Sequence, residues 1–452
     1  MSQSATLNQS SSPVTRLSIM MFLQFFIWGA WYVAMWGFMD KNGMTANSGS
    51  GAFVDAAYTV APIAAILAPL TLGLIADRFL NTEKVLSILF LVGAVLLYVA
   101  PGLAKGGAPE SVMDQFSHPM ILCLLAYMIC FMPTLGLTAS LSFSHLANGE
   151  KQFPVVRVMG TIGWIVGNWA MWFCRSIGLD AEQFADNSPH IFTAAAIASA
   201  LLGIYCLSLP KTAPPSKGKK ISIGEIVGID AWGLLKNRSF LVFALASFLI
   251  CIPLAGYYSK GAGYVGEMGV SLFGSTTGAM STGQMSEIFF MLIMPFCFAR
   301  LGVKWMLTIG MSAWVVRYGL WGFAFGQEGP LLTLPIFIGI LLHGICYDFF
   351  FVTGMIYTDK KAPAAIRSQA QSLVVMLTQG LGLGIGAQLF GRWTAACTVD
   401  GKVDFTKFWY APAVFAFGVM VLFFLLFWDK LKPDTSAEEV AKAATPDEES
   451  AM

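Results

Sequence analysis

Long apolar runs are the feature that most constrains how this chain can fold. A membrane-spanning helix needs about 20 mainly apolar residues in succession, and such runs recur along almost the whole sequence. We predict twelve spans: 17–39, 53–75, 84–104, 119–141, 156–175, 190–209, 239–259, 278–299, 305–325, 331–356, 368–391 and 408–428. The chain is 56% apolar and only 12% charged, whereas soluble domains carry roughly 25% charged residues. The sequence therefore predicts an all-α polytopic membrane protein in a lipid bilayer.

The breaks between these runs divide the chain into two halves. The longest break, 210–238, contains three prolines and several lysines and follows the sixth span. We predict a six-helix bundle over 1–209, a central cytoplasmic loop over 210–238 and a second six-helix bundle over 239–428. The tail, 429–452, is rich in Ala, Glu and Asp, a composition that predicts disorder.

The distribution of Lys and Arg predicts the orientation, because these residues concentrate in cytoplasmic loops. If both termini, the central loop and every even-to-odd connection lie on one side, that side holds most of the 27 basic residues. The opposite side then holds seven, namely Lys41, Lys105, Arg175, Lys260, Arg392, Lys402 and Lys407. We therefore expect both termini to be cytoplasmic.

Composition and spacing argue against several other classes of protein. A net charge of +1 does not favour a nucleic-acid partner. The four histidines are scattered without metal-binding spacing, and no phosphate-binding glycine loop is present. Most of the eight cysteines lie inside apolar runs, and only Cys397 falls in a predicted hydrophilic loop. We expect no enzyme, cofactor, metal cluster or disulfide, and an ion gradient as the energy source.

One stretch of the fifth span places polar side chains on a single helix face. Pro154 is expected to open this helix at its first turn, where its missing N–H matters little. Arg157, Thr161 and Trp164 follow at positions i, i+4 and i+7, so they share a face. Polar groups inside a membrane are costly and usually functional. We therefore expect this face to line a cavity for a polar, ring-bearing solute.

Later spans supply partners for this face. Gln284 and Glu287 lie in the eighth span, and His343, Tyr347 and Asp348 lie in the tenth. Structural roles compete with this interpretation for some of them: Arg157 could anchor the helix at the membrane surface, and His343 could be a packed core histidine. Arg317, in the ninth span, is expected to be a structural pair.

The two halves carry related motifs. The loop after span 2 contains Gly73, Asp77 and Arg78, and a weaker counterpart from Phe298 to Lys304 follows span 8. A proline also stands shortly before an arginine at the start of both span 5 (Pro154 and Arg157) and span 11 (Pro363 and Arg367). Such repeats are typical of two-half transporters, whose binding site lies between the halves near the middle of the membrane.

The motifs carry a resemblance to a known family. The Gly-x-x-x-Asp-Arg loop resembles the signature of the major facilitator superfamily, and within it the chain is similar to the nucleoside:proton symporter family of bacterial nucleoside permeases. The segments that carry this similarity are Phe22–Gly29, Phe131–Leu137, Phe153–Gly163, Gln284–Glu287, Tyr347–Phe350 and Pro363–Arg367. The resemblance implies the major facilitator fold and import of nucleosides by proton symport with alternating access. It also implies a monomer in the bacterial cytoplasmic (inner) membrane.

The resemblance implies roles for individual residues. Arg157, Thr161 and Trp164 would contact the nucleoside, and Gln284 and Glu287 would bind its polar groups. Tyr347 and Asp348 match an aromatic residue and an aspartate of the family, while His343 stands where its best-known members have Tyr. The loop residues Gly73, Asp77 and Arg78 would form the gating loop. Ala255 and Tyr258 occupy positions where those members have two amide side chains.

Physical arguments agree with this outline and leave the cargo open. A nucleoside base needs an aromatic face, which Trp164, Tyr258, Tyr347 or Phe143 could supply. Proton coupling needs a carboxylate whose proton affinity changes with burial and with a nearby cation. Glu287 and Asp348 are the candidates, with Arg157 or His343 as switching partners. Because the two amides are lost, a sugar or another small polar metabolite is the alternative cargo, and the coupling ion, expected to be H⁺, could also be Na⁺.

Overall fold

The computed structural model describes residues 12–44, 47–48, 51–71, 80–105, 112–213, 229–272, 276–400 and 402–429. Nearly all of these residues are helical, which confirms the predicted all-α class. The described strands form two small antiparallel hairpins: β1 (Asn47–Ser48) with β2 (Gly51–Ala52), and β3 (Thr398–Val399) with β4 (Lys402–Val403). The predicted gating-loop residues Gly73, Asp77 and Arg78 lie outside the described residues, as do most of the central loop and the tail after Asp429.

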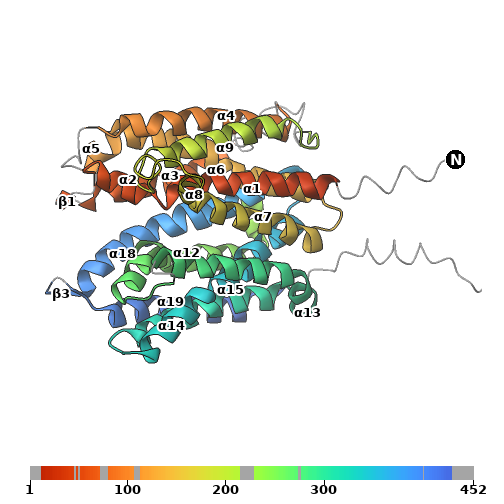
Figure 1. Ribbon diagram of the computed structural model, residues 1–452. Coiled ribbons are helices and arrows are strands. Elements are labelled where there is room, and N and C mark those ends of the chain that lie inside the picture. Colours follow the sequence, from red (N-terminus) through yellow and green to blue (C-terminus); the bar gives the residue numbers. More distant parts are fainter. Residues whose placement is uncertain are drawn as a thin grey trace, which may run out of the picture.

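The helices of the first half form the upper group in Figure 1. They are α1 (Ser12–Tyr32), α2 (Met35–Lys41), α3 (Phe53–Thr71), α4 (Thr82–Val99), η2 (Ala100–Leu103), α5 (Val112–Ser117), α6 (Pro119–His145), α7 (Gly149–Asn168), α8 (Ala170–Ser176) and α9 (His190–Cys206). Within this group α1 packs along α7 and α9, and α4 packs along α6 and α9.

The helices of the second half form the lower group in Figure 1. They are α11 (Ile229–Trp232), η3 (Gly233–Lys236), α12 (Arg238–Glu267), α13 (Thr276–Ala324), α14 (Pro330–Leu341), α15 (His343–Tyr347), η4 (Asp348–Val352), α16 (Thr353–Lys361), η5 (Ala364–Ile366), α17 (Arg367–Val375), η6 (Met376–Gly382), α18 (Leu383–Cys397) and α19 (Phe405–Leu426). Of these, η4 and η6 are π-helical turns. The two halves meet where α7 contacts α13, α6 contacts α17, and α3 contacts η6.

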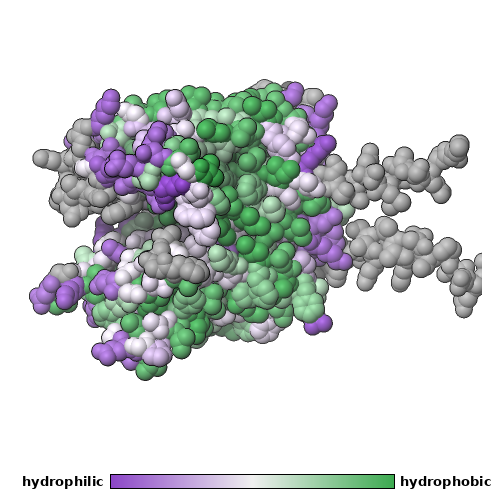
Figure 2. Space-filling view, in the orientation of Figure 1, coloured by the Kyte–Doolittle hydropathy of each residue, from purple (hydrophilic) through white to green (hydrophobic). Residues whose placement is uncertain are grey.

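The outer surface matches a membrane environment. Figure 2 shows a broad hydrophobic band across the middle of the molecule, with hydrophilic residues at its two ends. Large apolar side chains such as Val95, Ile197, Phe289 and Val414 are more than half exposed. Eight helices in the described part are long and apolar enough to cross a membrane. Every one of the twelve predicted ranges overlaps a described helix.

Two local expectations were wrong. Pro154 does not open its helix, because Asn148 caps α7 six residues earlier by accepting a hydrogen bond from the Lys151 amide. By contrast, the boundary between predicted spans 8 (278–299) and 9 (305–325) is confirmed, because the two helical parts of α13 are separated by a kink at Gly302, where φ is 67°. Such a positive φ favours glycine. Cys397 is 1% exposed at the end of α18 rather than in a hydrophilic loop, because the chain folds back and the Asp404 amide donates to its carbonyl.

Both halves begin and end at one end of the molecule, which we call the terminus face (right side of Figure 1). There Arg16 donates to the Ser208 carbonyl, and the Ser239 hydroxyl donates to the Trp428 carbonyl. The two halves also contact each other near this face, because Lys360 forms an ion pair with Glu150. The Glu150–Lys360 ion pair therefore joins the two halves near the terminus face.

Helices of the two halves also pack closely against each other beneath the terminus face. The Ser368 hydroxyl donates to the Ser140 hydroxyl over 2.9 Å, joining α17 to α6. A Cβ added to Gly136 of α6 would lie 2.5 Å from Ser372 Oγ of α17. The two halves are thus in direct contact between the terminus face and the candidate site.

Candidate functional site

Close packing of α7 against α1 fixes the first wall of the site. A Cβ added to Gly163 would lie 2.1 Å from the Phe22 carbonyl oxygen, and one added to Gly29 would lie 2.5 Å from the Trp164 carbonyl oxygen. Only glycine permits backbones to approach this closely. The approach brings Trp164 edge-to-face with Trp28, with 5.5 Å between ring centroids.

A second close contact joins α13 to α15. A Cβ added to Gly344 would lie 2.6–2.7 Å from the backbone of Ser286 and Glu287. The Gly344 amide also donates to Ser286 Oγ over 3.0 Å. These contacts fix the start of α15, including His343, beside the Glu287 side chain.

The centre of the site is a carboxylate held from both halves. Glu287 Oε2 accepts a hydrogen bond from Thr161 Oγ1 of α7 over 3.0 Å. Glu287 Oε1 lies 3.0 Å from His343 Nε2 of α15. All three side chains are buried, with 3–7% exposed. A buried carboxylate is costly unless it is hydrogen-bonded. These two contacts therefore offset the cost of burying Glu287.

Arg157 and Asp348 lie near this centre with unused hydrogen-bonding capacity. The Arg157 guanidinium packs over the Phe25 ring at 4.1 Å, and its Nε and Nη1 have no hydrogen-bond partner in the described chain. Asp348 is fully buried at the start of η4, and neither carboxylate oxygen has such a partner there. Asp348 lies within electrostatic range of both Glu287 and Arg157. The site therefore combines one hydrogen-bonded carboxylate with an unpaired cation and an unpaired acid.

Aromatic side chains surround the polar centre. The Tyr258 and Tyr347 hydroxyls lie 3.1 Å apart, and the Tyr347 ring lies 5.2 Å from the His343 ring. Tyr258 is 49% exposed although it belongs to the interior of a long apolar helix, so its ring is accessible to a ligand. Gln284 is half-buried one turn before Glu287 on α13.

Ala255, at the other family amide position, and Phe143, a possible face for the base, make their contacts elsewhere. Ala255 is 5% exposed and packs against α18, where a Cβ on Gly386 would lie 2.7 Å from its own Cβ. Phe143 stacks on Phe153 with 4.2 Å between ring centroids. Neither side chain therefore belongs to the group around Glu287, and of the two family amide positions only Tyr258 reaches it.

Sequence reasoning missed several residues next to the site. Trp28 lies inside the Phe22–Gly29 motif, yet only the α1–α7 approach shows that it meets Trp164. Tyr257 stacks against His343 with 5.6 Å between ring centroids. The resemblance to the family points to its neighbour Tyr258, and no sequence signal distinguishes Tyr257 from other core aromatics.

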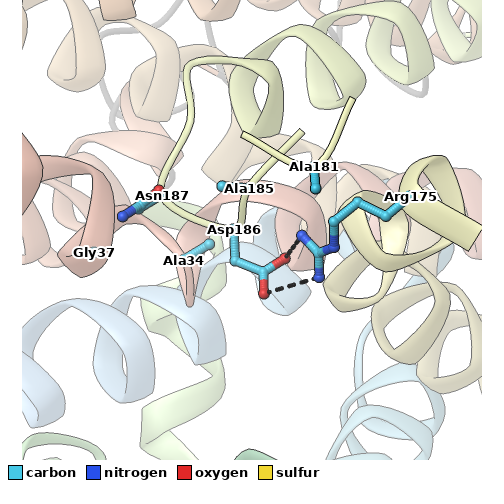
Figure 3. Close-up of a pocket in the computed structure, with 7 residues that line it drawn as sticks. All are labelled: Ala34, Gly37, Arg175, Ala181, Ala185, Asp186 and Asn187. Carbon is cyan, nitrogen blue, oxygen red and sulfur yellow. Dashed lines mark hydrogen bonds and ion pairs between the residues drawn. The ribbon is translucent and has the colours of Figure 1, made fainter. Parts of the chain in front are cut away.

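The described surface pockets lie away from this cluster. One of about 500 Å³ is lined by Ala34, Gly37, Arg175, Ala181, Ala185, Asp186 and Asn187, and Figure 3 shows Arg175 paired with Asp186 across it. Their atoms approach to 3.1 Å, so the two charges compensate each other. Another, of about 310 Å³, lies between α3 and the η6–α18 segment. Neither pocket includes a residue of the candidate site.

Comparison with known proteins identifies the family. The sequence profile described as "Nucleoside H+ symporter" matches residues 12–432. The chain belongs to this family of membrane transporters. It is 40% identical over 419 residues to the putative nucleoside transporter YegT of Escherichia coli K12, covering 91% of this chain and 93% of the relative. The nucleoside permease NupG of Escherichia coli K12 is 30% identical over 423 residues, which is 90% of this chain and 95% of that protein.

Solved structures agree on the fold. The crystal structure of the nucleoside transporter NupG superposes with a TM-score of 0.65 at 27% identity, covering 92% of this chain and 99% of that chain. The proton:xylose symporter XylE, a major facilitator protein, superposes with a TM-score of 0.66 at 12% identity, covering 93% of this chain and 97% of its own. The predicted family and the major facilitator fold are confirmed.

Proposed function

We propose that this chain imports nucleosides by proton symport with alternating access. The observation that carries the proposal is the Glu287 carboxylate, bonded to Thr161 of one half and to His343 of the other. The names of the relatives YegT and NupG support a nucleoside as the cargo. A titratable group that joins the two halves can couple protonation to their relative movement.

Proton binding at Glu287 would change this link. An ionised carboxylate only accepts hydrogen bonds, whereas a protonated one gains an O–H donor and loses acceptor capacity. Protonation would therefore weaken the contact with Thr161 or with His343 Nε2 and loosen the junction between the halves. Asp348 is a second proton carrier in this proposal, since it is buried close to Glu287 and lacks a hydrogen-bonding partner in the described chain.

The nucleoside would bind between the aromatic and polar groups. Trp164 and the accessible Tyr258 ring offer faces for the base, with Tyr347 beside them. Arg157 offers two nitrogens without a hydrogen-bond partner in the described chain, Nε and Nη1, and Gln284 adds an amide one turn from Glu287. Buried donors without a protein partner gain most when a ligand supplies the acceptor.

The two halves, 1–209 and 239–428, would move as bundles around this site. Contacts between α6 and α17 and between Glu150 and Lys360 close the terminus face, which favours a state open toward the opposite end. We place the terminus face and both termini in the cytoplasm of a bacterium, with the protein as a monomer in the cytoplasmic membrane. The loop of Gly73, Asp77 and Arg78 would act as the gating loop.

Uptake measurements test the proposal. Purified protein in liposomes is given labelled uridine or adenosine with and without an inward proton gradient. We expect gradient-dependent accumulation by the wild type and its loss in Glu287→Gln, while Glu182→Gln, an exposed carboxylate change, transports normally. Accumulation that ignores the proton gradient, or an unimpaired Glu287→Gln variant, would contradict the coupling role. An inward Na⁺ gradient in place of the proton gradient tests the other coupling ion.

A sugar or other small polar metabolite is the second candidate cargo. The observation that favours it is the Tyr258–Tyr347 hydroxyl pair, which offers hydroxyl groups to a sugar. Of the two, Tyr258 stands where the resemblance to the family leads us to expect an amide. Failure of folded wild-type protein to accumulate either nucleoside, together with competition or uptake by a sugar, would favour this alternative.

A further inference from the structure

Arg317 is a fully buried cation that the transport proposal does not use. It lies in the second part of α13 and is 0% exposed. Its Nε donates to the Gly339 carbonyl over 2.8 Å, and its guanidinium lies 4.5 Å from the centre of the Tyr257 ring. No carboxylate of the described chain pairs with it, and its Nη1 and Nη2 have no hydrogen-bond partner there. Because an unpaired charge inside a membrane protein is costly, packing alone does not account for it.

The Gly339 contact lies next to an interruption of the tenth span. In a continuous helix the Gly339 carbonyl accepts the amide four residues later, which is that of His343. Instead α14 ends at Leu341 and α15 begins at His343. A side chain that enters this hydrogen-bond ladder is a known cause of helix interruption. Arg317 therefore contacts the backbone at the place where the His343 segment begins.

Trp321, one turn after Arg317 on α13, makes a second hydrogen bond to the backbone of α14. Its indole Nε1 donates to the Ile336 carbonyl over 3.1 Å. A Cβ added to Gly339 would lie 2.2 Å from this nitrogen, so the glycine is required for the contact. Two side chains of α13 thus hold the end of α14 through its carbonyl groups.

Tyr257 provides a second route from Arg317 to His343. The Tyr257 ring lies under the Arg317 guanidinium and also stacks on the His343 ring, with an interplanar angle of 23°. His343 Nε2 in turn meets Glu287 Oε1 at 3.0 Å. Arg317 is therefore connected to the central carboxylate through one aromatic ring and one imidazole.

We propose that Arg317 is a positioning residue for the proton-binding pair Glu287–His343. It fixes the start of α15 and the Tyr257 ring, so that the imidazole meets the carboxylate, and its charge offsets Glu287 when the site carries no proton. The charged and titratable groups around this arrangement are Arg157 on α7, Tyr257 and Tyr258 on α12, Glu287 and Tyr318 on α13, and His343, Cys346, Tyr347 and Asp348 on the tenth span. This inference rests on the proposed proton symport.

The test compares Arg317→Gln and Arg317→Lys with Arg300→Gln. Arg300 lies on the same helix and also stacks on an aromatic ring, Phe296 at 4.0 Å, but it is exposed, so it is a matched control. Two quantities are measured in liposomes: accumulation driven by a proton gradient, and exchange of labelled for unlabelled nucleoside without a gradient. The exchange assay reports binding and movement without net proton coupling.

We expect Arg317→Gln to lose gradient-driven accumulation by roughly 10- to 100-fold, the cost of misplacing a reacting group, while exchange stays close to the wild type. Arg317→Lys keeps the charge but not the planar fork, so we expect partial accumulation. Arg300→Gln should match the wild type in both assays. Equal losses of accumulation and exchange in Arg317→Gln, or no loss in either, would overturn the inference.

A double variant separates positioning from an independent effect. If Arg317 acts through His343, Arg317→Gln combined with His343→Gln should be no worse than His343→Gln alone. Multiplied losses would refute the connection. If the Arg317 variants do not fold, Tyr257→Leu provides the same comparison, since it removes the ring and keeps the cation. Failure of the wild type itself to exchange nucleosides would instead refute the proposed function.

Discussion

At the scale of single residues, the buried charged groups of the site differ in how many hydrogen-bonding partners they have. Glu287 has two hydrogen-bonding partners, from opposite halves of the molecule, whereas neither oxygen of Asp348 has one in the described chain. A hydrogen bond to a charged group contributes about 1.5–3 kcal/mol, and an unmet buried group costs a similar amount. Glu287 is therefore held in place. Asp348 is available to a proton, and Arg157 is available to a ligand.

Replacing Thr161 tests the link between the halves. Thr161→Val keeps the shape of the side chain and removes the hydroxyl that donates to Glu287. We expect the loss of this hydrogen bond to raise the activation free energy by about 1.4 kcal/mol or more. That change corresponds to gradient-driven uptake that is at least roughly tenfold slower. Thr161→Ser should retain most activity, and Thr333→Val, an exposed hydroxyl change, should have no effect. Wild-type uptake by Thr161→Val would show that the hydrogen bond is dispensable.

At the scale of helices, the site is held by places where backbones nearly touch. Gly163 lies against α1 and Gly344 lies against α13, and a methyl group at either position would overlap a backbone atom. Interrupted helices complete the arrangement, with a break at Leu342 and a π-helical turn that starts at Asp348. π-helical turns recur at functional sites. Rigid helix pairs thus set the position of each polar group.

Gly344→Ala should therefore disturb the fold and the site together. The new methyl carbon would lie 2.6 Å from a backbone carbon of Ser286, and such overpacking typically costs about 1–3 kcal/mol. Thermal unfolding of detergent-purified protein should show a lower Tm. Gly418→Ala is the control, because its added methyl meets nothing within 4 Å. Equal Tm values for both variants would mean that α13 and α15 can separate without cost.

This dependence on packing explains what the sequence could predict. The i, i+4, i+7 spacing placed Arg157, Thr161 and Trp164 on one face of α7, because helix periodicity alone decides it. The Glu287–His343 contact joins residues that are distant in the sequence, and it needs a helix break that no proline marks. The roles of Tyr257 and Arg317 were missed for the same reason, since each depends on which neighbouring helix it faces.

At the scale of the whole molecule, the fold class and the family could be predicted from the sequence more reliably than the local geometry could. Apolar runs identify membrane helices because every backbone polar group in lipid must be satisfied within the helix. The same rule does not locate a kink at Gly302 or a cap at Asn148, which depend on local backbone and side-chain contacts. The arrangement of the halves, by contrast, follows from contacts that join them at the terminus face and at Glu287.

Charge reversal tests whether the terminus face acts as a gate. Glu150 and Lys360 form an ion pair between the halves, and their side chains are 20% and 14% exposed. Either Glu150→Lys or Lys360→Glu alone places like charges together, which should weaken closure at this face. Because ion pairs that retain some exposure contribute up to about 1 kcal/mol, we expect each single reversal to slow uptake by roughly twofold to fivefold.

The double reversal, Glu150→Lys with Lys360→Glu, restores opposite charges and should recover most of the uptake, which a double-mutant cycle measures directly. The Ser368–Ser140 hydrogen bond and the Gly136–Ser372 contact remain in all three variants, so the fold and the substrate site are retained. A parallel set of the same variants carries Ser140→Cys, which gives up the Ser368–Ser140 hydrogen bond. Reaction of this cysteine with a water-soluble reagent, compared with Ser140→Cys alone, reports the opening of the face independently of transport. The rate of this reaction should rise in the single reversals and return to the level of the unreversed protein in the double reversal. If the double reversal transports no better than the worse single one, the pair acts only as surface charge, and the α6–α17 contact alone closes this face.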